Sequence, residues 1–142
     1  MGLVQLPKLA EFVDTRRENS GWFRRELAQY GDFFDFQEEQ AKGRHSWFGF
    51  PIRVKANAGF KVTELTKALN AKHVETRPII AGNIARQPAL KMFEHRVVGD
   101  MRHSNAVMDG AFSFGNHQDV DSGARQYVAE QVRAFLRSRS LA

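Results

Sequence analysis

Residues 75–89 read Glu75-Thr76-Arg77-Pro78-Ile79-Ile80-Ala81-Gly82-Asn83-Ile84-Ala85-Arg86-Gln87-Pro88-Ala89, and they combine more binding-capable and backbone-restricting residues than any other window of the chain. The ring of Pro78 keeps Arg77 out of the helical region, so Arg77 is expected to end an extended segment. Gly82 allows a turn or a close backbone approach because it has no Cβ. Pro88 suits the first position of a short helix. The stretch therefore predicts a strand, a shaped loop and a helix start.

Two long amphipathic segments flank this stretch. The first is expected to form a long helix, because its apolar residues recur at gaps of three and four: Leu6, Leu9, Phe12, Val13, Phe23, Leu27 and Tyr30. Gly31 and Asp32 then stop the helix. The second is a closing helix expected over residues 121–137, with one apolar face: Ala124, Tyr127, Val128, Val132, Phe135 and Leu136.

Short strands and helices are expected between these two segments. The strands are predicted at 33–36, 47–54, 74–77 and 111–114, and the helices at 63–72, 87–93 and 102–109. Pro51 cannot donate to a ladder, so its strand is expected near an edge or with a bulge. A long helix that precedes short strands favours an α+β fold over a doubly wound sheet. We expect a small antiparallel or mixed sheet covered on one side by helices.

The composition excludes several classes of protein. A chain of 142 residues fits one compact domain, and no apolar run approaches the length needed to cross a bilayer. The absence of cysteine rules out disulfides and thiolate metal sites and suits a reducing cytoplasm. The histidines share no metal-ligand spacing, so no metal site is expected. The net charge of +5 favours phosphate-bearing partners in general. A mildly basic net charge more often reflects solvated surface residues than a specific nucleic-acid-binding patch.

Arg86 is the foremost candidate for ligand contact. Its guanidinium can donate two parallel hydrogen bonds to a phosphate, although a surface arginine paired with a carboxylate is the alternative. Asn83 and Gln87 offer donors and acceptors for sugar hydroxyls or a base edge, and their alternative role is to cap the turn. Arg77, at the end of a strand, has the same two alternatives: a phosphate contact or a structural ion pair.

Asn116 and His117 form a second pair of candidates. They follow one expected strand and precede the closing helix, a place where side chains often point into a cleft. His117 could donate to a substrate oxygen, and the alternative is a partly buried histidine bonded to backbone. Ser20, Ser46 and Ser113 lack a nucleophile-elbow context, so hydrolase chemistry has no support.

The 75–89 stretch resembles the E-T-R-P-x-x-x-G-N-x-x-R-Q-P-A segment of the DegT-type enzymes. These are pyridoxal-phosphate-dependent aminotransferases and dehydratases of nucleotide-linked keto sugars. The branch that it resembles most is that of the 3-dehydratases of 4-keto-6-deoxyhexoses, which serve lipopolysaccharide biosynthesis. Three further stretches agree in the same order: Gly2–Leu9 with Arg16–Asn19, Ser46–Ile52, and Phe114–His117.

The resemblance covers nearly the whole chain but only the back portion of such an enzyme. It implies a C-terminal fragment of fold-type I architecture, in which residues 1–30 are the helix leaving a large domain and residues 31–142 form the small domain. The Schiff-base lysine of the aminotransferases, or the histidine that replaces it in the 3-dehydratases, belongs to the large domain. We therefore expect no catalytic residue here, pyridoxal phosphate bound mainly by the large domain, and no turnover by this chain alone.

In the complete enzyme, the resemblance implies a homodimer whose small domain shapes the cleft for a nucleotide-diphosphate sugar. The residues that it marks for substrate binding are Gly82, Asn83, Arg86, Gln87, Arg77, Asn116 and His117. His73 departs from the pattern, which has glycine at that position after a helix, and histidine is uncommon in a left-handed cap. The other functions left open are a stand-alone phosphosugar- or nucleotide-binding module and a small basic nucleic-acid-binding domain. No membrane association is expected, and nucleic-acid binding is the less favoured alternative.

Overall fold

The structure is a computed structural model that describes residues 2–141. Its helices are α1 (Gly2–Gln5), α2 (Leu9–Leu27), α3 (Val62–Ala71), α4 (Arg102–Gly110) and α5 (Ser122–Ser138). Its short 3-10 helices are η1 (Leu6–Lys8), η2 (Ala28–Tyr30), η3 (Ile84–Arg86) and η4 (Pro88–Met92). Its strands are β1 (Phe34–Phe36), β2 (Gly49–Val54), β3 (Thr76–Pro78) and β4 (Ala111–Gly115). None of these helices is long and apolar enough to span a bilayer.

The strands form one antiparallel sheet with the order β1-β2-β4-β3. The predicted α+β class is confirmed, and the sheet is purely antiparallel. Pro51 lies on β2, which is an inner strand, so the expectation of an edge strand was wrong. The register with β4 runs through Pro51 opposite Ser113 without a bulge. The proline is tolerated because β1 pairs with β2 only from Ile52 onward, which leaves Pro51 without a partner on that side.

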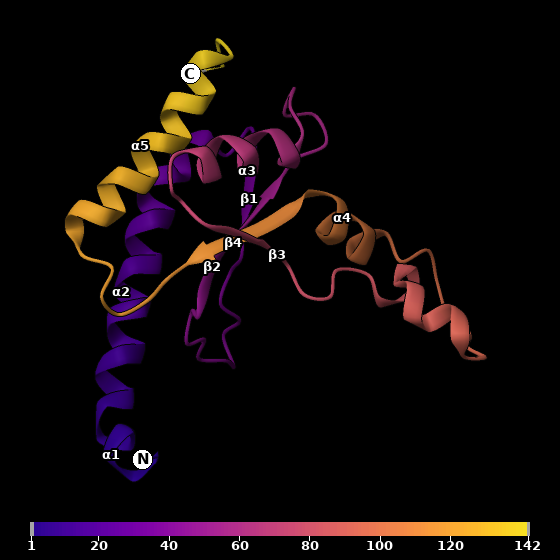
Figure 1. Ribbon diagram of the computed structural model, residues 1–142, viewed down its shortest axis with the longest axis horizontal. Coiled ribbons are helices and arrows are strands. Elements are labelled where there is room, and N and C mark those ends of the chain that lie inside the picture. Colours follow the sequence, from indigo (N-terminus) through magenta and orange to yellow (C-terminus); the bar gives the residue numbers. More distant parts are fainter. Residues whose placement is uncertain (1, 142) are drawn as a thin grey trace.

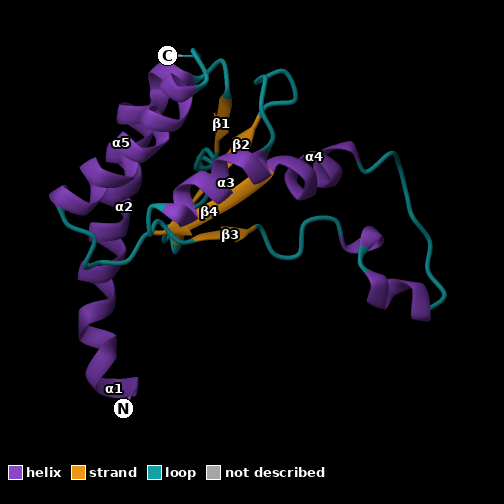
Figure 2. Ribbon diagram, turned by 45° about the horizontal axis from the view of Figure 1, so that its top comes forward, coloured by secondary structure: helices purple, strands orange, loops and turns teal. Residues whose placement is uncertain are grey.

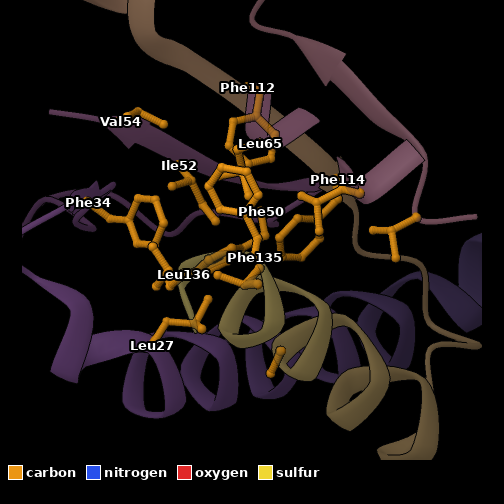
Figure 3. Close-up of a cluster of buried hydrophobic side chains, with 14 of the residues drawn as sticks. Leu27, Phe34, Phe50, Ile52, Val54, Leu65, Phe112, Phe114, Phe135 and Leu136 are labelled. Carbon is orange, nitrogen blue, oxygen red and sulfur yellow. The ribbon is translucent and has the colours of Figure 1, made fainter. Parts of the chain in front are cut away.

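One face of the sheet is covered by α2, α3 and α5 (Figures 1 and 3). Side chains alternate along a strand, so every second residue of β2 and β4 points to these helices. Phe50 and Phe114 meet Phe23 of α2 there, with ring centroids 4.9–5.4 Å apart. Leu65 of α3 and Leu136 of α5 are fully buried beside them. Burial of these aromatic and aliphatic groups is the main source of stability.

The other face of the sheet carries small or half-buried residues. Gly49 and Ser113 lie there, and a Cβ on Gly49 would sit 3.3 Å from the carbonyl oxygen of Phe114. Within residues 2–141, α2, α3 and α5 pack on the first face, whereas α4 borders the end of the second, where Val107 shares a hollow with Pro51 and Ala111. Small side chains on this face leave room for hollows, and some of the candidate residues line one of them.

The long first helix is interrupted near its start. A single helix was expected from residue 6, but Leu6–Lys8 form η1 and α2 begins at Leu9. Pro7 explains the difference, because it cannot donate the backbone hydrogen bond that a continuous helix needs at that position. From Leu9 the predicted helix is confirmed, and Phe23 and Leu27 supply its buried end.

Residues 79–101 form an arm that extends away from the body (Figures 1 and 2). The arm contains η3 and η4 and little other regular structure. Several of its large apolar side chains are exposed: Ile80, Ile84, Met92, Phe93, Val97 and Val98. Because few apolar groups of the arm are buried, its base must be held by polar contacts to α4.

Candidate functional site

A hollow of about 370 Å³ opens where β2, β3 and β4 meet α2. We call it the sheet-end hollow. Its polar lining comes from separate elements: Arg16 on α2, Arg77 on β3, and Ser113, Asn116 and His117 on or just after β4. Its apolar walls are Phe48, Pro78, Ile79, Ile80 and Phe114. The size falls at the lower end of small-molecule pockets, and a largely apolar lining with a few polar groups is typical of them.

Asn116 forms the back of this hollow as a buried tie between elements. Its side-chain amide donates to the carbonyl oxygens of Arg16 and Trp47 and to the hydroxyl of Ser20, each at 2.9 Å. The residue is fully buried, and its Oδ1 has no partner within the described residues. Asn116 thereby fixes the position of Arg16 relative to the ends of β2 and β4.

The three cationic or titratable side chains of the hollow differ in their pairing. Arg77 forms an ion pair with Glu75, and its side chain is largely exposed. The ring Nδ1 of His117 lies 3.2 Å from the backbone N of Asp119 and 3.3 Å from the carboxylate Oδ2 of the same residue. Arg16 has no carboxylate within 4 Å in residues 2–141, and its Nε is buried without a partner. Arg16 is therefore the cation of the hollow whose charge is left uncompensated.

The remaining candidates lie at the base of the arm, where they form a bracket to α4. Asn83 is buried, and its Oδ1 accepts the N–H of Ala85 at 3.0 Å, which caps η3. Its Nδ2 donates to Oδ1 of Asn105 at 2.9 Å. Gln87 donates to the carbonyl oxygen of Ala81 at 2.7 Å and closes the loop. The Asn83 side chain thus caps η3, whereas the Gln87 side chain makes no helix cap and ties two points of the loop together.

Arg86 holds the same bracket by charge. Its Nη1 lies 2.8 Å from both carboxylate oxygens of Asp109 and 3.2 Å from Oδ1 of Asn105. Hydrogen bonding to Asp109 raises the pKa of Arg86, and the same bond lowers the pKa of the Asp109 carboxyl. The Arg86 side chain is 45% exposed, so the ion pair lies at the surface.

Gly82 is required by both conformation and space. Its φ is +64°, a region that side chains rarely adopt, and an added Cβ would lie 2.9 Å from the side chain of Met108. The close approach lets the arm leave the sheet directly over α4. Gly82 therefore shapes the bracket and does not itself bind through a side chain.

The structure divides the seven predicted residues into two groups. Arg77, Asn116 and His117 line the sheet-end hollow, whereas Gly82, Asn83, Arg86 and Gln87 belong to the bracket. Their role in substrate binding stays a prediction. Arg16 also lines the hollow, although it was not among the residues predicted from the sequence. A signal was present, because residues 16, 20, 23 and 27 follow the spacing of the buried stripe of α2.

Comparison with known proteins assigns the chain to a family. Residues 1–133 match the model of the DegT/DnrJ/EryC1/StrS aminotransferase family. Lipopolysaccharide biosynthesis protein RfbH of Salmonella typhimurium is 33% identical over 95% of this chain and 31% of that protein. GDP-4-keto-6-deoxy-D-mannose 3-dehydratase of Yersinia pseudotuberculosis is 34% identical over 83% of this chain and 30% of that protein. The chain spans about a third of the length of these curated relatives.

Solved structures agree with the sequence comparison. The Escherichia coli GDP-4-keto-6-deoxy-D-mannose-3-dehydratase with bound hydrated PLP superposes with a TM-score of 0.83 at 30% identity. The superposition covers 92% of this chain and 33% of that enzyme. The aminotransferase TlmJ of Streptoalloteichus hindustanus shares the fold, with a TM-score of 0.74 at 21% identity, 96% coverage of this chain and 35% of that one. The chain therefore belongs to the DegT/DnrJ/EryC1/StrS aminotransferase family.

Proposed function

We propose that this chain is the small-domain portion of a pyridoxal-phosphate-dependent enzyme that acts on nucleotide-linked 4-keto-6-deoxy sugars. The reaction is 3-dehydration or transamination, in the biosynthesis of lipopolysaccharide or other deoxysugars. One observation carries the proposal: the chain superposes over 92% of its length on one third of a GDP-4-keto-6-deoxy-D-mannose 3-dehydratase. The 33–34% identity to RfbH and to a second 3-dehydratase supports the same assignment.

Residues 1–30 would lead out of a large domain in this proposal, and residues 31–142 would form one wall of the substrate cleft. The sheet-end hollow and the bracket are then two parts of that wall. Arg77 and the partly exposed Arg86 would contact phosphate oxygens, which a guanidinium recognises by paired hydrogen bonds. Asn83, Gln87 and Gly82 would hold the loop that presents Arg86, and Asn116 and His117 would close the hollow. The complete enzyme would be a homodimer.

The described residues are not expected to form a pyridoxal phosphate site by themselves. Such a site needs a residue to attack or shuttle protons at the cofactor, held near groups that grip its ring and phosphate. No lysine lines the sheet-end hollow. Lys55, beside α4, donates to the carbonyl oxygen of Gly31 at 2.6 Å and lies 3.6 Å from Asp35 Oδ1. We therefore assign no step at the cofactor to this chain and propose that it has no turnover alone.

A chimera tests the proposed function. The chain would replace the matching third of the Escherichia coli GDP-4-keto-6-deoxy-D-mannose 3-dehydratase. We expect a protein that retains pyridoxal phosphate and dehydrates GDP-4-keto-6-deoxy-D-mannose. The proposal would be contradicted by a folded chimera that holds the cofactor but neither dehydrates this substrate nor transaminates it to a 4-amino sugar.

The claim of inactivity alone has its own test. The isolated chain would be mixed with pyridoxal phosphate, dialysed, and examined for the absorbance of a Schiff base. We expect no band to remain, because the cofactor-binding residues are proposed to lie in the large domain and the amine of Lys55 already donates to the carbonyl oxygen of Gly31. A band that survives dialysis would show that this chain carries a cofactor site of its own.

A further inference from the structure

We propose that the sheet-end hollow is a subsite for an organic oxyanion and that Arg16 supplies its charge. The ligand class is a phosphate or carboxylate attached to a small carbon body. Sugar-linked phosphates belong to this class, so for the identity of the natural ligand the inference rests on the proposed function. Binding by the hollow itself can be tested without that function.

The electrostatics of Arg16 carry the first step. A guanidinium that is partly withdrawn from water loses hydration and needs a compensating partner. The Nε of Arg16 is buried without a hydrogen-bond partner in residues 2–141, and no described carboxylate lies within 4 Å of its guanidinium. Several other arginines of α2 and α5 are paired: Arg17 with Glu39, Arg125 with Glu18 and Arg133 with Glu26. An incoming oxyanion would give Arg16 what these arginines already have.

The position of Arg16 is fixed before any ligand arrives. Asn116 donates to the carbonyl oxygen of Arg16 and, on the other side, to that of Trp47, both at 2.9 Å. Asn116 is fully buried, so these bonds are shielded from water. Asn116 therefore acts as a positioning residue: it holds the α2 backbone at Arg16 against the mouth of the hollow. Because the backbone at Arg16 is already held, only its side chain has to be ordered when an anion binds, which lowers the entropic cost of binding.

The walls of the hollow explain why the ligand needs a carbon body. Phe48 is 82% exposed and Ile80 is 92% exposed, and both line the hollow. Large apolar side chains that remain open to solvent beside a cation are typical of a binding surface. A bare inorganic anion would satisfy Arg16 and leave these walls uncovered. A ring or chain attached to the anion would cover them and add apolar burial.

Arg77 lies in the same hollow but is less suited to supply the principal charge. It already forms an ion pair with Glu75, and its side chain is 75% exposed. Water therefore screens its charge more than that of Arg16. We expect Arg77 to contribute at the rim and Arg16 to contribute most of the affinity.

Calorimetric titration of the 142-residue chain tests the inference. The probes are α-D-mannose 1-phosphate, D-gluconate and neutral D-mannose. We expect at least one of the two anions to bind, with inorganic phosphate weaker, and D-mannose not to bind. The tighter anion identifies the oxyanion as phosphate or carboxylate. Arg16→Gln should weaken that anion at least about tenfold, which is the scale of a lost charged hydrogen bond. Arg16→Lys should lose less.

Arg24→Gln provides the matched control. Arg24 lies on the same helix and pairs with exposed Glu38, away from the hollow, so its variant should change affinity less than about twofold. The side-chain Nε–H signal of Arg16 can also be followed during titration of the unmodified chain. This measurement does not require that any variant fold correctly. Absence of binding by both anions, or equal affinity in the Arg16→Gln and Arg24→Gln variants, would overturn the inference. Failure of the chimera with intact anion binding would overturn only the proposed function.

Discussion

The bracket at the base of the arm and the sheet-end hollow contain similar residue types, but these residues are paired with protein groups in the bracket and partly unpaired in the hollow. In the bracket, Asn83 and Arg86 have protein partners, namely Ala85, Asn105 and Asp109. In the hollow, Arg16 is half-buried, its Nε has no hydrogen-bond partner, and no ion pair with a carboxylate is formed among the described residues. Polar groups that pair with each other shape the chain, whereas polar groups held in place without a partner are available to a ligand. The comparison separates candidates that residue type alone cannot separate.

The largest expected effect comes from removing the tie behind the hollow. Asn116→Ala would leave two carbonyl oxygens and a hydroxyl without their donor in a buried setting. The cost should be about 4 kcal/mol, because each unsatisfied buried group costs about 1–3 kcal/mol. Urea unfolding measures the change, with exposed Asn57→Ala as the control, which should stay within about 0.5 kcal/mol. If the two variants were equally stable, Asn116 would not be the residue that holds these elements together.

The next effect concerns the approach of the arm to α4. Gly82→Ala should destabilise the protein by about 2 kcal/mol, since the new Cβ is strained by φ and meets Met108. Gly99→Ala is a matched control with φ of +79° and open space around the Cβ, so it should cost only about 1 kcal/mol. The difference between the two free energies of unfolding isolates the contact with Met108. Identical costs would mean that the bracket tolerates a wider approach.

A smaller effect is expected from the cap of η3. Asn83→Ala removes the acceptor for the N–H of Ala85 and the donor to Asn105. Loss of a capping residue costs about 1 kcal/mol. Hydrogen exchange should therefore speed up at residues 84–92 and stay unchanged on β4. Faster exchange throughout the sheet would show that the bracket is not a separate unit from the hollow.

The smallest effect is the pH dependence of the bracket. The pKa of Asp109 is lowered in the folded chain from its ordinary value of 3.8, chiefly by hydrogen bonding to Arg86. A lowered folded pKa stabilises the fold above the unfolded pKa, and that contribution is lost as pH falls through the folded value. The carboxyl carbon signal of Asp109 should therefore titrate below pH 3.8, and Arg86→Gln should raise its midpoint. If Arg86→Gln left the midpoint unchanged, the ion pair between Arg86 and Asp109 would not contribute to the bracket.

Much of the fold could be predicted from periodicity. The stripe from Leu9 to Leu27 and the face of α5 gave helices within a few residues of those observed, because long amphipathic patterns are strong signals. Residue 73 has a φ of +59°, so histidine adopts the left-handed conformation that glycine would otherwise supply. The inner position of β2 was not predictable, since strand order depends on pairings distant in sequence.

The site was harder to predict than the fold. A polar residue type indicates what a side chain can bond, but not which partner the fold brings to it. Asn83 and Asn116 were both expected at a site, and the structure uses the bonds of both to join elements. Arg16 was missed because an arginine on a helix is usually a solvated residue. Only its place on the stripe that becomes buried distinguishes it from Arg17.

One spectrum tests the contrast between the two regions most directly. The side-chain Nε–H signals of Arg16 and Arg86 would be followed while α-D-mannose 1-phosphate is added to the isolated chain. Our expectation is that the Arg16 signal shifts more than the Arg86 signal, because the carboxylate of Asp109 already compensates part of the charge of Arg86. A shift at Arg86 with none at Arg16 would contradict it.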